Sequence, residues 1–181
     1  MDNRPRCSWC NLKNPLCVAY HDDEWGVPVY DDRKLFEMLL LESFQAGLSW
    51  ECILNKREAF RKAFDNFDYN LVAAYDRTKL ESLMSDKGII RNRLKINAAV
   101  TNARIFMNIQ QEKGSFSDYL WSFTSGKTIR ETGFTRSPLS DAVSKDLRTR
   151  GMKFVGTTII YSYLQAVGII NSHDCHCWRS L

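Results

Sequence analysis

The sequence predicts a single all-α domain, and three observations support that fold class. Apolar residues recur mostly at helical spacing along the chain. Residues that favour helix N-termini, such as Ser and Asp, precede several of these apolar runs. The sequence contains no convincing pair of strands around a hairpin turn. Because 181 residues suffice for one domain, we expect residues 1–181 to fold as a unit.

The first predicted helix follows the capping pair Asp31–Asp32 and ends near Gly47. Ser49 caps the next helix, whose apolar positions extend from Trp50 to Phe64. The string Thr78-Lys79-Leu80-Glu81 has the spacing of a capping box and predicts a short helix.

A long basic helix is predicted after Gly88-Ile89-Ile90, and it ends before Gly114. Another short helix is predicted from Ser117 to Phe123. Residues 124–138 are rich in Thr, Ser, Gly and Arg, which indicates an irregular connection.

Two helices joined by a glycine-bounded hairpin are predicted over residues 141–168. Ser140–Asp141 caps the first helix, Gly151 ends it, and Thr157–Thr158 opens the second. The N–H groups at the start of a helix carry partial positive charge, so Gly156 would admit a phosphate and Lys153 would add a cation. On spacing alone, an ordinary turn between packed helices is the simpler interpretation.

Composition excludes some classes of protein. An apolar content of 44% excludes a mainly disordered chain. The net charge of +4 suits a polyanion such as nucleic acid but does not require one. The segment Met1–Arg6 lacks an apolar core, so no signal peptide is expected. No apolar run approaches the ~20 residues of a membrane helix. We therefore expect a cytosolic protein. We also expect a monomer, located in the bacterial cytosol or nucleoid.

Cysteine and histidine gather at the two ends of the chain. The first 21 residues and the last nine hold eight of them, with only Cys52 between: Cys7, Cys10, Cys17, His21, His173, Cys175, His176 and Cys177. Four such ligands would close one structural zinc site per chain. Spacing leaves the choice of four open, and free thiols or a disulfide are alternatives. No HExxH-like string indicates a catalytic metal.

Several strings together resemble a known family. They are Tyr20-His21-Asp22-Asp23-Glu24-Trp25-Gly26-Val27-Pro28, Leu35-Phe36-Glu37-Met38, Glu42, Gln45-Ala46-Gly47-Leu48-Ser49-Trp50, Gly88-Ile89-Ile90-Arg91 and Lys153-Phe154-Val155-Gly156-Thr157-Thr158. With the terminal Cys and His residues, these strings resemble the DNA-3-methyladenine glycosylase I family over nearly the whole chain.

The resemblance implies a helix-hairpin-helix DNA glycosylase. Its hairpin would anchor DNA through Lys153, Gly156 and Thr157. The family's structural zinc would be held by Cys7, His21, His173 and Cys177, although Cys10, Cys175 and His176 are further candidates. Glu42 would be the pocket carboxylate, Tyr20 and Trp50 the stacking aromatics, and Trp9 and Trp25 further walls. Cys17 stands where the family often has an aromatic residue.

These residues suit the removal of 3-methyladenine from alkylated double-stranded DNA. Such an enzyme extrudes its target nucleotide into a pocket. The methylated nucleoside is cationic, so aromatic faces and a carboxylate favour it over neutral adenine. The base leaves as a neutral group, which makes a strong general acid unnecessary. We expect a monofunctional hydrolase that releases free 3-methyladenine. The alternatives are a zinc-stabilised binding module without activity and a zinc hydrolase.

Overall fold

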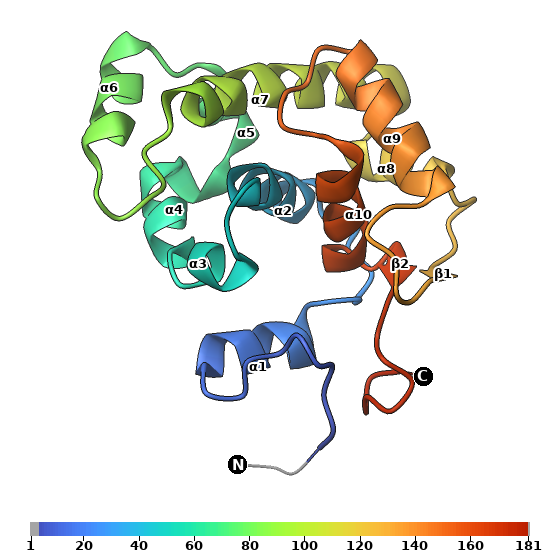
Figure 1. Cartoon of the computed structure of the whole chain (residues 1–181). Coiled ribbons are helices and arrows are strands. Elements are labelled where there is room, and N and C mark those ends of the chain that lie inside the picture. The colour runs from blue at the N-terminus through green and yellow to red at the C-terminus, as the bar shows by residue number, and fades with distance from the viewer. Residues whose placement is uncertain (1–3, 181) are drawn as a thin grey trace.

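The computed structural model describes residues 4–180, and its regular structure is mostly helical (Figure 1). Residues 1–3 of the predicted N-terminal segment, and residue 181, lie outside the described part. The elements in chain order are α1 (Pro15–Asp23), α2 (Asp32–Gln45), α3 (Trp50–Leu54), α4 (Arg57–Ala63), η1 (Asp65–Phe67), α5 (Tyr69–Ala73), α6 (Arg77–Ser85), α7 (Arg93–Lys113), α8 (Phe116–Ser122), β1 (Ile129–Arg130), α9 (Pro138–Thr149), α10 (Thr157–Ala166) and β2 (Ile170–Asn171).

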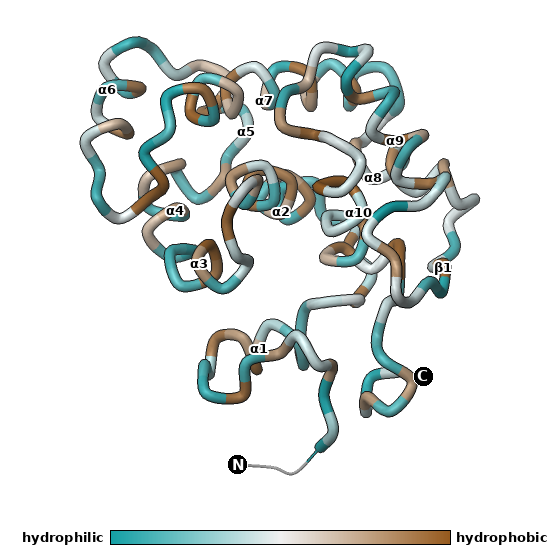
Figure 2. Tube along the Cα trace, in the orientation of Figure 1, coloured by the Kyte–Doolittle hydropathy of each residue, from teal (hydrophilic) through white to brown (hydrophobic). Residues whose placement is uncertain are grey.

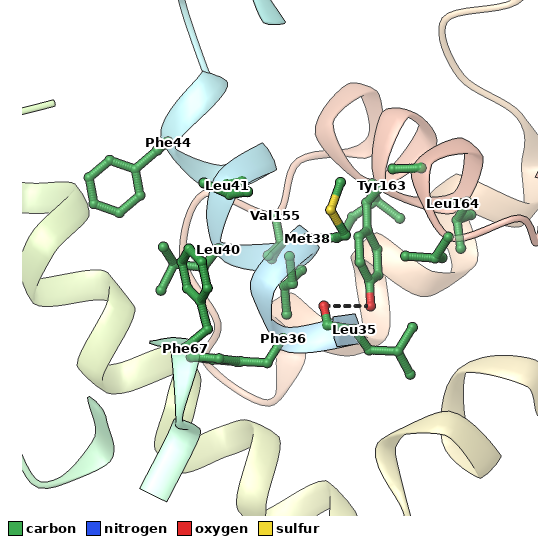
Figure 3. Close-up of a cluster of buried hydrophobic side chains, with 14 of the residues drawn as sticks. Leu35, Phe36, Met38, Leu40, Leu41, Phe44, Phe67, Val155, Tyr163 and Leu164 are labelled. Carbon is green, nitrogen blue, oxygen red and sulfur yellow. Dashed lines mark hydrogen bonds between the residues drawn. The ribbon is translucent and has the colours of Figure 1, made fainter. Parts of the chain in front are cut away.

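Helix α2 forms the centre of the core. Its side chains from Leu35 to Phe44 are all buried, and α7, α8 and α10 pack around it. Figure 3 shows Leu35, Met38 and Tyr163 in this cluster, where the Tyr163 hydroxyl donates to the Leu35 carbonyl oxygen at 3.2 Å. A helix that is buried on all sides is held by contacts on every face. Glu42 lies on this helix, so its position is fixed by the core.

Capping residues define most of the helix starts. Asp31 and Ser49 cap α2 and α3 as predicted, with side chains that accept from Lys34 N and Cys52 N. Three predicted starts are wrong by one to three residues, because earlier polar side chains reach the free amides. The observed caps are Asp76 for α6, Ser115 for α8 and Ser137 for α9.

The structure differs from the predicted elements in the following features. The predicted helix over residues 50–64 is two helices, α3 and α4, since the chain turns at Asn55 and Lys56. Helix α1, η1 and α5 were not predicted. In η1 the backbone is left-handed, with φ of 54° at Asn66. Finally, Ile129 and Arg130, inside the predicted irregular region, pair in parallel with Ile170 and Asn171.

The two ends of the chain lie on the same side of the bundle (Figure 1). Trp178 N donates to the Pro5 carbonyl oxygen at 2.9 Å, and Ser8 N donates to Asp174 Oδ2 at 3.0 Å. Figure 2 shows that residues 4–23 contain both hydrophilic and hydrophobic stretches. Among the described helices, none has the length and apolarity that a membrane span requires.

The string Tyr20–Pro28 packs against the end of α10. Gly26 N donates to the Gln165 carbonyl oxygen at 3.0 Å, and Val29 N donates to that of Val167 at 3.1 Å. Gly168 lies so close that a Cβ there would come within 2.3 Å of the Val27 carbonyl carbon. This contact holds the N-terminal aromatic residues over the C-terminal half of the chain.

Candidate active site

A cavity of about 380 Å³ opens between the N-terminal segment, α2, α3 and α10. Its lining contains all five residues predicted to form a base pocket, together with six others. The eleven are Trp9, Tyr20, Trp25, Glu42, Gln45, Trp50, Gly133, Ser162, Gln165, Ser172 and Asp174. Residues from both ends of the chain therefore meet residues from its middle in one cavity.

Four aromatic side chains form two contacting pairs in the walls. The Trp9 and Trp25 rings are 4.8 Å apart at 71°, and the Tyr20 and Trp50 rings are 5.0 Å apart at 46°. Tyr20 and Trp25 are buried, whereas Trp9 is 39% exposed. A flat ligand that enters the cavity would meet aromatic surface from several directions, which suits a purine ring.

Glu42 is a carboxyl group without a partner inside this cavity. Its side chain is 2% exposed, and Oε2 has no hydrogen-bond partner among the described residues. Burial raises the pKa of Glu42 to about 8. Gln45 Oε1 and Trp50 Nε1, which border the same cavity, also lack partners there. Three such atoms at one cavity are unusual in a folded protein and indicate a polar ligand.

A buried ion cluster ties α1 to the core beside the pocket. The Arg57 guanidinium donates to both carboxylate oxygens of Glu24 at 2.8 Å and to Glu37 Oε1 at 2.7 Å. Burial alone would raise the pKa of Glu24, but the hydrogen bonds from Arg57 and Lys34 hold it at about 2. The carboxylate thus stays ionised, and Arg57 fixes the end of the helix that carries Tyr20.

Three potential metal ligands lie together where the two ends of the chain meet. The donor atoms of Cys7, His21 and Cys177 are all within 4.8 Å of one another, and all three side chains are buried. Backbone amides of Asp174 and Arg179 donate to the Cys7 and Cys177 sulfurs at 3.3 and 3.4 Å. Burial raises the pKa of the Cys7 thiol to about 12, although the hydrogen bond from the Asp174 amide acts in the opposite direction.

His173 lies beside this group but outside it. Its ring centroid is 5.3 Å from that of His21, and its Nε2 is buried without a partner in the described part. Its Nδ1 lies 3.0 Å from Asn171 Oδ1. An amide oxygen accepts hydrogen bonds, so this contact requires the tautomer in which Nδ1 carries the hydrogen. The nitrogen without a partner is therefore the one free to bind a metal.

His21 is oriented in the same way. Its Nδ1 lies 2.8 Å from the Asp22 carboxylate, which leaves Nε2 facing Cys7 and Cys177. Burial would raise the pKa of Asp22, but hydrogen bonds from Arg6, His21 and Trp178 hold it well below its usual range. A carboxylate behind a histidine is the usual second layer of a metal site.

The other candidate ligands point elsewhere. Cys10 and Cys17 are buried near each other, where the Cys10 thiol donates to the Cys17 carbonyl oxygen at 3.7 Å. Cys175 and His176 are exposed. Among the described residues, the donor atoms that lie together are those of Cys7, His21 and Cys177, which are three of the four predicted ligands.

The predicted hairpin borders a second, more open groove of about 860 Å³. Gly151 ends α9 with φ of +102°, and Lys153 to Gly156 lead into α10. Four cations line the groove against one carboxylate, Asp141; the cations are Arg136, Lys145, Arg148 and Lys153. The groove therefore presents a positive surface.

No side chain caps the N-terminus of α10, where Gly156 is the N-cap residue. Gly156 has φ of −63°, which any residue can adopt, and a Cβ there would meet nothing within 4 Å. The fold itself does not require this glycine. The Thr157 hydroxyl donates to Asp141 Oδ1 at 2.6 Å, so its backbone N–H rather than its side chain is available.

Helix α7 holds both the hairpin and the rim of the pocket. Asn102 bonds the backbone N–H and carbonyl oxygen of Lys153, both at 2.9 Å. Lys95 Nζ donates to the carbonyl oxygens of Phe44 and Ala46 at 2.7 and 2.6 Å, at the end of α2. The sequence analysis missed both residues, although Asn and Lys on the buried face of a helix are a detectable signal.

Comparisons with known proteins agree with this arrangement. The family model described as methyladenine glycosylase matches residues 9–180. DNA-3-methyladenine glycosylase 1 of Escherichia coli (strain K12) is 48% identical over 179 residues, 95% of each chain. A crystal structure of 3-methyladenine DNA glycosylase I matches with a TM-score of 0.93 and 46% identity, over 98% of this chain and all of that one.

A second solved structure contains a ligand. It is a tyrosine-to-phenylalanine variant of 3-methyladenine DNA glycosylase I in complex with 3-methyladenine, with a TM-score of 0.93 and 36% identity over 97% of both chains. The family match spans nearly the full described chain, and the identities lie far above those at which only the fold is shared. The chain belongs to the methyladenine glycosylase family of enzymes.

Proposed function

We propose that this protein removes 3-methyladenine from alkylated duplex DNA by hydrolysis of the N-glycosidic bond. The observation that carries the proposal is Glu42, a buried carboxyl group without a partner in a cavity walled by four aromatic rings. Relatives named for this activity, and a related structure with 3-methyladenine bound, support the same substrate.

Charge explains the preference for the damaged base. The 3-methylated nucleoside carries a positive charge, which aromatic faces and a carboxylate attract. Because burial raises the pKa of Glu42 to about 8, the empty pocket holds this group largely protonated at neutral pH. A cation beside it favours the ionised form. Neutral adenine would bring no charge to offset the burial of the carboxylate.

The same charge makes the bond easy to break. Water adds to the sugar C1′ as the C1′–N bond breaks, and the bonding electron pair neutralises the ring of the departing base. The water then loses its proton to solvent. Glu42 favours the flipped cationic nucleotide electrostatically, and no general acid is needed. None of the described residues that line the pocket is a lysine, which supports a monofunctional enzyme without lyase activity.

The hairpin would bind the DNA backbone. The uncapped amides at the start of α10 and the open space over Gly156 suit a phosphate oxygen. Lys153 adds a cation at the same edge of the groove. This assigns a helix-hairpin-helix anchor to residues 141–168, with Thr157 contributing through its backbone.

A structural zinc would join the two ends of the chain. Cys7, His21 and Cys177 lie close enough to share an ion, and His173, whose Nε2 has no partner in the described part and whose ring lies 5.3 Å from that of His21, would be the fourth ligand. When bound, the zinc supplies no chemistry; it fixes the position of Trp9 and Tyr20 near the pocket.

One experiment tests the proposed activity. The protein is incubated with duplex DNA treated with a methylating agent, and the released bases are identified by chromatography. We expect free 3-methyladenine and unbroken DNA strands. Strand cleavage would indicate lyase activity, while DNA binding without base release would favour a binding module. Loss of base release on chelation, with folding and DNA binding unchanged, would favour a zinc hydrolase.

A further inference from the structure

The loop of residues 131–137 runs from the base pocket to the hairpin groove. Gly133 lines the pocket, and Arg136 lines the groove. Figure 1 shows this loop between β1 and α9. Both ends are fixed, since Glu131 N donates to the Asn171 carbonyl oxygen at 3.1 Å and Ser137 N donates to Ser140 Oγ at 2.8 Å. Because the loop joins a residue of the pocket to a residue of the groove, a DNA strand that contacted both sites would pass close to it.

Phe134 is the exposed apolar side chain of this loop. It is 61% exposed, and no aromatic or cationic side chain of residues 4–180 packs on its ring. A single exposed apolar residue is common on protein surfaces. Leu71 on α5 is exposed to a similar degree, at 52%, yet it lies away from both DNA sites. The position of Phe134 between the pocket and the groove therefore matters more than its exposure.

The surroundings of Phe134 suit a DNA strand. On the groove side lie the four cations described above, although Arg136 donates to Asp141 Oδ2 at 2.7 Å and so is partly neutralised. Leu48 is 41% exposed in the turn between Gln45 and Trp50, which both line the pocket. Leu48 and Phe134 are therefore exposed apolar residues on two segments that contribute to the pocket.

Extrusion of a base leaves its neighbours without a stacking partner. Proteins that distort duplex DNA insert apolar side chains at such steps, and aromatic rings stack on bases of any sequence. We propose that Phe134 packs against the strand that carries the extruded nucleotide, beside the gap and on the groove side. This inference rests on the proposed function and adds a residue that contacts the substrate DNA outside the base pocket.

The test measures binding to two duplexes, one with a stable abasic analogue and one intact. Phe134→Ala should lower affinity for the abasic duplex about tenfold and leave affinity for the intact duplex within twofold. It should also slow excision of 3-methyladenine about tenfold, while affinity for the free base is unchanged. Leu71→Ala is the matched control and should alter none of these values. Phe134→Leu should restore part of the loss.

The outcomes separate this inference from the proposed function. Equal behaviour of Phe134→Ala and Leu71→Ala on the abasic duplex would overturn the inference. So would an equal loss on both duplexes, which indicates a general backbone contact. A wild-type protein that releases no base would refute the proposed activity, yet the abasic duplex would still report on Phe134. Because Phe134 is exposed, melting temperatures should match and exclude misfolding.

Discussion

The pocket draws its walls from the whole chain, from Trp9 to Asp174, whereas the hairpin groove is lined by residues 136–157 alone. The pocket's carboxyl is buried, and burial raises the pKa of Glu42 to about 8, whereas the groove's cations face solvent. The difference teaches that, in the proposed function, recognition of the damaged base would depend on the complete fold and on charge in a low-dielectric site. Binding of the DNA backbone would depend on local geometry and on charge that salt screens.

Loss of the proposed zinc should produce the largest difference between the effect on the pocket and the effect on the groove. In the chain-entropy model, closing a loop of roughly 100 residues or more reduces the entropy of the unfolded chain and so raises its free energy by about 4–5 kcal/mol. A zinc ion held by both His21 and Cys177 would close such a loop, because these residues are 156 positions apart. We expect one zinc per chain, and a loss of stability of this order in Cys177→Ser, measured by urea unfolding.

The same variant should lose affinity for free 3-methyladenine while its affinity for undamaged DNA changes little, because the hairpin lies outside the junction of the chain ends. Cys175→Ser is the control, since this thiol is exposed. A metal-free protein with an unchanged urea midpoint would refute the zinc proposal.

Glu42→Gln tests the pocket alone. The change keeps the shape of the side chain and removes its charge, so excision should slow by about 100- to 1000-fold, as for other buried groups that stabilise charge. Affinity for undamaged duplex should stay within twofold. Glu58→Gln, an exposed change on α4, should have no effect. Single-turnover kinetics supplies the rates, and a wild-type rate for Glu42→Gln would make this carboxyl structural.

The raised pKa of Glu42 also predicts how stability depends on pH. The folded state keeps this proton up to about pH 8, whereas the unfolded state releases it near pH 4.5. Between these values the unfolded state binds fewer protons, so the stability contributed by this group falls as pH rises.

We expect Glu42→Gln to gain about 2–3 kcal/mol relative to wild type between pH 5 and pH 7, since one pKa unit corresponds to about 1.4 kcal/mol. Urea unfolding of both proteins at several pH values measures the gap. A gap that does not change with pH would show that Glu42 is ionised in the folded pocket.

Lys153→Ala should give the smallest effect, and it concerns the groove alone. Loss of one phosphate contact should weaken binding to any duplex about two- to tenfold and reduce the salt slope by about one. Binding of free 3-methyladenine should not change. Lys62→Ala, on exposed α4 surface, is the control. If the salt slope stays constant, the hairpin is an ordinary turn between helices.

The sequence predicted the parts of the fold that depend on local patterns. Helices α2, α7 and α10 have long apolar stripes, and Asp31 and Ser49 cap where expected. Helix α1 was missed because its buried residues include Cys17, His21 and Asp22, which give no apolar stripe. The bridge of Ile129 to Ile170 joins positions 41 apart, a pairing that no local pattern contains.

The site residues, too, could be predicted only where the family resemblance or local spacing indicated them. The family resemblance indicated Trp9, Tyr20, Trp25, Glu42 and Trp50, and all five line one cavity. Gln45 lies one turn after Glu42 and could have been inferred from that spacing. Ser162, Ser172 and Asp174 could not, because their place in the pocket depends on how α10 and the C-terminal segment cross the N-terminal one.

Helix α7 fixes the distance between the hairpin and the rim of the pocket. Lys95 and Asn102 are seven residues apart, which is about 10 Å along a helix and almost two full turns, so both point into the protein. Inserting one residue between them would rotate Asn102 by about 100° and detach the hairpin from its support. In the proposed function, the distance between the phosphate-binding hairpin and the base pocket would therefore be set by the number of residues that separate Lys95 from Asn102 on this helix.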